Sequence, residues 1–173
     1  PGVSLTQKDR NTDEVYLGYS SPKTPSRVFK YNLATKSKEL VKEQEIPSGH
    51  NKDDYIVERV DFKSHDGRMV PITITRHKKT KLDGSAKLLL YGYGSYGRSM
   101  SPSFSSTRIS LIERDIIWVT SHIRGGMEKG MKWWKEGKLL NKKNTFEDYI
   151  ASAKFLIEKN ITKIETPTPK IKE

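Results

Sequence analysis

Apolar and polar residues alternate along the first part of the chain, which predicts antiparallel β-strands over residues 1 to about 45. Two apolar series show the period of two: Val15, Leu17 and Tyr19, then Phe29, Tyr31 and Leu33. Pro22 and Pro25 interrupt the alternation between them, and a polar turn precedes the short run 39–41. Short strands with polar connections are typical of a half-buried meander such as a propeller blade.

A polar stretch that holds Pro47 and Gly49 predicts a boundary, with one domain over 1–45 and a second over 46–173. The second begins with a hairpin whose turn is Asp66-Gly67. One face of its first strand carries Glu58, Val60 and Phe62, and its return strand carries Val70, Ile72 and Ile74.

Two later apolar runs, 86–91 and 116–119, lack alternation and predict strands buried on both faces of an α/β sheet. A helix is expected over 103–114, with Phe104, Leu111 and Ile112 on one side. A longer helix is expected from Asn144 to about Asn160, with Asn144 and Glu147 forming a capping pair. Its apolar series is Phe146, Tyr149, Ile150, Ala153, Leu156 and Ile157. The order strand, helix, strand, helix predicts the first part of a doubly wound sheet, and the Thr-Pro-rich tail 161–173 is expected to be frayed.

Composition narrows the class of protein. Hydrophobic residues make up 34% of the chain, which is low for a self-sufficient core but not typical of disorder. There is no cysteine, so disulfides and thiolate metal sites are excluded, and no apolar run approaches the roughly 20 residues of a membrane span. We therefore expect a cytoplasmic protein without membrane contact, and the first residue, Pro1, indicates that the sequence begins inside something larger.

The net charge of +11 leaves nucleic-acid binding open as an alternative. The lysines are scattered through turns and helix faces rather than gathered in one stripe with interleaved aromatic residues. A lysine-rich solvated surface is therefore the favoured interpretation.

Gly92-x-Gly94-x-x-Gly97 directly follows a predicted strand and formally matches a dinucleotide-binding fingerprint, with Asp115 about 20 residues on. That fingerprint needs a helix to begin inside the glycines, whereas here the loop 98–102 ends in a proline. Ser95 lacks the glycine two residues before it that a nucleophile elbow requires, and no serine in the chain satisfies Gly-x-Ser-x-Gly. Ser95 is therefore expected to be a turn residue.

The four histidines form no His-x-x-x-His pair and have no carboxylate cluster at ligand spacing. No metal and no cofactor is expected. His122 ends a predicted strand at the edge where α/β sheets place their sites, as a structural hydrogen-bonding residue or as a site residue.

Four ordered blocks carry a family resemblance: YSSPKTPSRVFKYNLAT (19–35), LLLYGYGSYG (88–97), HIRGG (122–126) and GKLLNKKNTFEDYIASAKFLIEK (137–159). Together they resemble the oligopeptidase B branch of the prolyl oligopeptidase family. The resemblance implies the first part of an α/β-hydrolase sheet, preceded by β-strands from the end of a β-propeller. It also implies serine-type hydrolysis of peptides after Arg or Lys.

By the same resemblance, Tyr93 supplies an oxyanion-hole hydroxyl and Tyr96 lies at the substrate pocket. Residues of the site-supporting loop would be His122, Arg124, Gly125, Gly126 and Glu128. The family usually has a third glycine where this chain has Met127, so a positive φ there would strain the loop.

The resemblance also implies that the Ser/Asp/His triad lies beyond the sequence given. The chain is then expected to be an inactive fragment with an open apolar edge at strand 86–91. The alternatives are one half of a split enzyme completed by a carboxyl-terminal chain, or a basic nucleic-acid-binding module.

Overall fold

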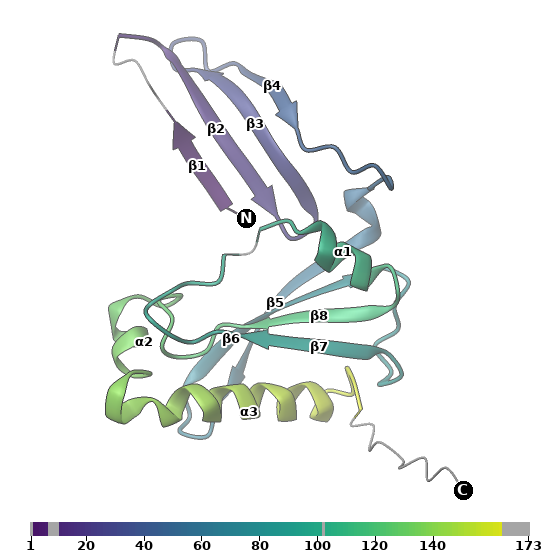
Figure 1. The fold of residues 1–173 in the computed structure, drawn as a ribbon, viewed down its shortest axis with the longest axis vertical. Helices are drawn as coiled ribbons and strands as arrows, with labels where there is room; N and C mark the ends of the chain where they lie inside the picture. Colours follow the sequence, from purple (N-terminus) through teal and green to yellow (C-terminus); the bar gives the residue numbers. More distant parts are fainter. Residues whose placement is uncertain (1, 7–10, 102, 164–173) are drawn as a thin grey trace, which may run out of the picture.

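A computed structural model describes residues 2–6, 11–101 and 103–163. Two sheets account for the strands in this part of the chain (Figure 1). The first is antiparallel, with the order β1-β2-β3-β4, and consists of β1 (Gly2–Thr6), β2 (Glu14–Ser21), β3 (Thr24–Asn32) and β4 (Lys38–Glu43). It matches the predicted meander.

A connection containing the short 3-10 helix η1 (Lys52–Asp54) leads to the second sheet, whose order is β5-β6-β8-β7. Its strands are β5 (Tyr55–Lys63), β6 (Met69–His77), β7 (Lys87–Gly92) and β8 (Ile116–Ser121). The hairpin β5–β6 turns at Asp66-Gly67 as predicted, with Gly67 at a φ of 83°. β6 pairs with β8 antiparallel, and β7 pairs with β8 parallel.

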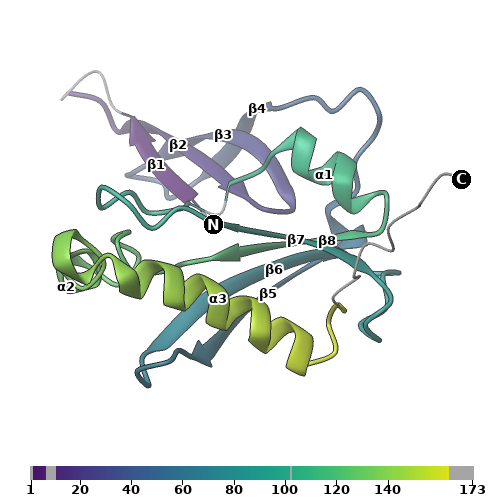
Figure 2. The same ribbon diagram turned by 60° about the horizontal axis from the view of Figure 1, so that its bottom comes forward.

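Helices lie on both faces of this sheet (Figure 2). α1 (Ser106–Ile112) lies on the face toward the first sheet, and α3 (Lys143–Glu158) runs along the other. α2 (Met131–Lys135) and the 3-10 helix η2 (Leu139–Asn141) connect β8 to α3. Within the described residues, no helix has the length and apolar character needed to cross a membrane.

The main core lies between the sheet and α3. Most of its buried members come from β5, β6, β8 and α3, among them Phe62, Ile72, Ile117, Val119 and Leu156. A smaller core on the opposite face joins Tyr55 to Ile109 and Ile112 of α1. Ile161 also belongs to the main core, and the Thr162 hydroxyl donates to the Ala86 carbonyl at 3.1 Å. The first residues of the predicted frayed tail are therefore packed, and 164–173 lie outside the described residues.

Several local expectations are wrong, each because of tertiary context. Leu89 of β7 is 36% exposed, because β7 is an edge strand and is not covered on both faces. α1 buries Ile109 and Ile112 rather than Leu111.

The predicted start and buried face of α3 also need correction. Asn144 does not cap the helix, because its side-chain amide donates to the Glu136 carbonyl instead, at 2.9 Å. Phe146 and Ile150 are 60% and 48% exposed. The buried face is partly polar and consists of Thr145, Asp148, Ser152 and Leu156.

Candidate active site

Two loops meet at one edge of the second sheet. Since β7 and β8 are parallel, their carboxyl ends lie together, and the glycine-rich turn 92–97 lies beside the loop 122–128. The Gly97 amide donates to the Gly125 carbonyl at 3.0 Å and joins the two loops directly. α1 begins only at Ser106, so no helix N-terminus opens within the glycines and the dinucleotide interpretation is excluded.

The glycines allow the two loops to approach closely. Gly125 has a φ of 97°, and a Cβ there would lie 2.0 Å from the Gly94 carbonyl oxygen. Gly94 has a φ of 58°, and a Cβ there would lie 2.5 Å from Cγ2 of Thr145. Larger residues at either position would push the loops apart, so the motif serves loop packing rather than contact with a pyrophosphate.

Tyr93 and Tyr96 project from this turn. Tyr93 is 38% exposed, and its ring faces the Arg98 guanidinium with 5.9 Å between the ring centroid and Cζ. Its hydroxyl forms no hydrogen bond within the described part of the chain, so it is free to donate to a ligand. Tyr96 is 90% exposed and has a φ of 53°, which directs its side chain away from the core.

Lys142 fixes the backbone of the turn from the start of α3. Its Nζ lies 2.6 Å from the Gly94 carbonyl oxygen and 2.7 Å from Oγ of Ser95. Burial lowers the pKa of the Lys142 ammonium. Ser95 is a turn residue, as predicted, and its hydroxyl is engaged by this lysine.

His122 and Glu128 form a buried pair behind the turn. His122 is 2% exposed, its Nε2 lies 2.8 Å from Oγ1 of Thr73, and its Nδ1 lies 3.8 Å from Oε1 of Glu128. Glu128 also accepts the Met100 amide at 2.8 Å. Burial alone would raise the pKa of the Glu128 carboxyl, but His122 and the Met100 amide outweigh it and hold this pKa below its ordinary value. The pair connects the segment after the glycine-rich turn to the loop after β8.

Met127 causes no backbone strain in this loop. It is not among the described residues with positive φ, a conformation that Gly125 and Gly130 adopt nearby. The condition under which strain was expected, a positive φ at this position, is not met. The geometry of Glu128 is intact next to it.

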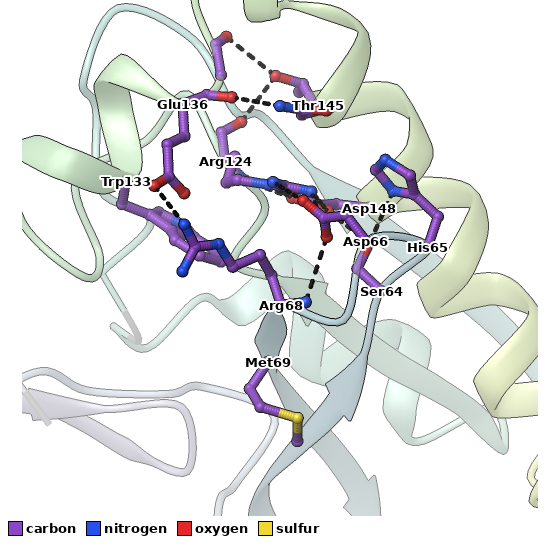
Figure 3. A network of polar contacts seen from close by, with 12 residues as sticks. Ser64, His65, Asp66, Arg68, Met69, Arg124, Trp133, Glu136, Thr145 and Asp148 are labelled. Carbon is purple, nitrogen blue, oxygen red and sulfur yellow. Dashed lines mark hydrogen bonds and ion pairs between the residues drawn. The ribbon is translucent and has the colours of Figure 1, made fainter.

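Arg124 is the centre of a buried ion-pair network (Figure 3). Its guanidinium donates to both carboxylate oxygens of Asp148, from Nε at 2.8 Å and from Nη2 at 2.6 Å. Nη1 donates to Asp66 at 2.6 Å. Burial opposes the charge of Arg124, but the two carboxylates raise its pKa above the ordinary value. Arg124 is 1% exposed, and its guanidinium is bound by these two carboxylates.

Further hydrogen bonds hold the same loop. The Thr145 hydroxyl bonds to the Arg124 carbonyl at 2.8 Å, and the Trp133 indole donates to the His122 carbonyl at 3.0 Å. Ser64 donates to Asp148 at 2.6 Å. Sequence reasoning missed Asp148 in this role, although an acidic residue one turn from Thr145 and Ser152 inside an apolar series signals a buried partner.

The arrangement presents two exposed phenols, Tyr93 and Tyr96, on a turn that is hydrogen-bonded to the neighbouring loop. In the described residues, no three His, Cys, Asp or Glu side chains gather as a metal site would require. The tyrosine hydroxyls can donate hydrogen bonds near the edge of the sheet. No serine of the chain lies in a Gly-x-Ser-x-Gly sequence, so the site has no nucleophile of that kind.

Comparisons with known proteins agree with this architecture. The model of the prolyl oligopeptidase family matches residues 102–166. Dipeptidyl aminopeptidase BI of Pseudoxanthomonas mexicana is 39% identical over 87% of this chain and 21% of its own length. Protease 2 of Moraxella lacunata is 37% identical over 91% of this chain and 23% of its own length. The structure of oligopeptidase B from Leishmania major superposes with a TM-score of 0.82 at 36% identity, and covers 89% of this chain and 22% of that one.

The chain thus spans about a fifth of the length of the curated relatives it matches. The similarity confirms the fold class: propeller strands followed by the first part of an α/β-hydrolase sheet.

Proposed function

The chain belongs to the prolyl oligopeptidase family, and we propose that it forms the part of a serine oligopeptidase that carries the oxyanion-hole hydroxyl, on Tyr93. In the proposed reaction, a serine from outside these 173 residues attacks a peptide carbonyl. Tyr93 donates a hydrogen bond to the oxygen that becomes negative. Such a donor stabilises the transition state more than the ground state.

The supporting observation is the Tyr93 hydroxyl itself. Tyr93 is 38% exposed, and the turn that carries it is held by Lys142 and by the Gly97–Gly125 hydrogen bond. A donor that is rigid before the reaction costs no reorganisation when charge develops. Tyr96, in the same turn, is the proposed contact for the substrate side chain.

Activity of the 173-residue chain by itself is not expected, since it holds no serine in an elbow sequence. Cleavage after Arg or Lys is the proposed specificity, by similarity to the oligopeptidase B branch. The cytoplasm is the proposed location.

A chimera tests the proposal. Residues of this chain would replace the matching 158-residue segment of Moraxella lacunata Protease 2, and hydrolysis of a benzoyl-arginine anilide would be measured. We expect the chimera to turn over and Tyr93→Phe to lower kcat by about 10²–10³-fold. The isolated chain should give no turnover above background.

Tyr91→Phe is the matched control, because Tyr91 lies two residues away and its ring stacks on Trp118 with centroids 6.0 Å apart. It should leave kcat within about twofold. Folding of each chimera would be checked by an unchanged circular dichroism spectrum. Full kcat in a folded Tyr93→Phe chimera would contradict the role of Tyr93. Turnover by the pure isolated chain would contradict its inactivity.

A second version of the proposal is completion by a separate carboxyl-terminal chain. The open edge of β7 favours it, because an edge strand with unpaired backbone groups can accept a strand from another chain. Co-expression with the carboxyl-terminal part of Protease 2 would then restore turnover. Failure of both copurification and turnover would exclude this version.

A further inference from the structure

A hollow of about 390 Å³ opens beside the glycine-rich turn, between Tyr96 and the segment that joins α2 to α3. Its apolar walls are Tyr96, Trp134 and Leu139, and its polar lining includes Lys138 and Lys142. Both the turn and the helix segment contribute, so a molecule held there would lie next to the proposed active-site turn.

Two of the residues that line the hollow adopt an unfavourable backbone conformation. Tyr96 and Leu139 have φ values of 53° and 49°, and they are the only large apolar residues with positive φ in the described part of the chain. Their side chains are 90% and 83% exposed. A bulky residue in the left-handed region is strained, and such strain is concentrated at functional sites. Here the two strained residues are neighbours in space, and their exposed apolar side chains line the same hollow.

The charged groups of the hollow lack counter-ions. The Lys142 ammonium is bound to a carbonyl and a hydroxyl, which leaves one of its three donors unused. The Lys138 ammonium lies 3.7 Å from the centroid of the Trp134 ring. Neither lysine forms an ion pair with a carboxylate of the described residues. Two ammonium groups beside apolar walls are complementary to a molecule that carries one anionic group next to an apolar side chain.

We propose that this hollow binds the carboxyl terminus of a short peptide, with the terminal apolar side chain between Tyr96, Trp134 and Leu139 and the α-carboxylate on Lys138 and Lys142. The assignment rests on the proposed function, since it takes peptides as the ligand class of the neighbouring turn. It adds a preference for free carboxyl termini that the oxyanion role of Tyr93 does not require.

Binding to the intact 173-residue chain, without turnover, tests the assignment. The tripeptide Ala-Ala-Phe would be titrated as the free acid and as its carboxyl-terminal amide, by calorimetry and by amide chemical shifts. We expect the acid to bind about tenfold more tightly than the amide, because only the acid forms charge-assisted hydrogen bonds with the lysines. The shifted amides should include those of Tyr96 and Leu139.

Two variants separate binding from folding. Lys138→Gln removes an ammonium that holds no structural hydrogen bond, and should reduce the preference for the acid to about threefold or less. Lys135→Gln, on an exposed position of α2, is its matched control and should leave the preference unchanged. Leu139→Gly should weaken binding of acid and amide alike while leaving the melting temperature equal or higher, because glycine adopts positive φ without strain.

Equal binding of acid and amide, or no binding of either, would overturn the assignment, as would a Leu139→Gly variant with unchanged affinity. Tighter binding of adenosine monophosphate with the same shifts would point to nucleic acid instead, and self-association through these residues would point to a second copy. Because no turnover is measured, failure here leaves the chimera experiment on Tyr93 unaffected, and the reverse also holds.

Discussion

At the scale of single residues, the Arg124–Asp148 pair determines how rigidly the site loops are held. Both side chains are at most 1% exposed, and the guanidinium forms a bidentate contact with the carboxylate. A buried pair of this kind adds little net stability compared with an apolar pair, but loss of one partner leaves an uncompensated charge.

Asp148→Ala should therefore destabilise the chain by about 3–5 kcal/mol. Asp66 remains as a partner of Arg124, but it is partly exposed and cannot replace the lost contacts. Urea denaturation followed by circular dichroism would measure the change. Glu147→Ala is the matched control, because Glu147 is the next residue in the chain and its carboxylate contacts only the exposed Lys143 at 3.9 Å. This substitution should change the free energy of unfolding by about 0.5 kcal/mol or less. Similar values for the two variants would contradict the importance of the buried network.

The family resemblance names Tyr93 and Arg124 as site residues but not Asp148, for a physical reason. Tyr93 and Arg124 stand in the short sequence blocks that carry the resemblance, so they can be located from local sequence alone. The role of Asp148 depends on Arg124, 24 residues away, and on Ser64, 84 residues away. Only the packing of α3 against the sheet brings these three together.

At the scale of elements, β7 is the least protected edge of the second sheet. It carries one charged residue, Lys87, along Lys87–Gly92, whereas the opposite edge strand β5 carries charges at Glu58, Arg59, Asp61 and Lys63. Charges on an edge strand prevent pairing with a strand of another molecule, and β7 has only Lys87, at its first position.

We expect the isolated chain to self-associate through β7 as its concentration rises. Leu89→Lys places a charge on a residue that is already 36% exposed, and should shift the apparent mass by light scattering toward the monomer. Val3→Lys, on the uncharged outer strand β1 of the first sheet, is the comparison. If Val3→Lys disperses the chain and Leu89→Lys does not, the associating edge is β1 and the prediction is wrong.

The elements themselves show which local signals are sufficient. The turn Asp66-Gly67 and the hairpin pairing around it follow from residues close together in the chain and are present as expected. The buried face of α3 does not follow from its apolar period, because Asp148 and Thr145 face the sheet to bind the loop after β8. Phe146 and Ile150 are exposed as a result, although their spacing is that of a core face.

At the scale of the whole molecule, the two sheets differ in how many buried apolar residues pack against them. The second sheet holds both hydrophobic cores, one on each face. In the first sheet, Val15 is the one buried hydrophobic residue among those described, and Val3, Leu5 and Val41 are all at least 50% exposed. Polar contacts link the first sheet to loops beside the second: the Phe104 amide donates to Oγ of Ser20 at 3.0 Å, and Nε2 of His50 lies 2.8 Å from the Lys23 carbonyl oxygen.

Stability should therefore be unequal within the chain. Amides open for hydrogen exchange by local unfolding where few apolar contacts oppose it. We expect the central strands β6 and β8 to exchange at least about 100-fold more slowly than β2 and β3, although all four have backbone partners on both sides. Deletion of residues 1–45 should leave the protection of β6 and β8 within a fewfold of its original value, because neither hydrophobic core draws on that segment. Equal protection of the two sheets in the intact chain, or collapse of β6 protection after the deletion, would mean that the propeller strands are part of the folding unit that positions Tyr93.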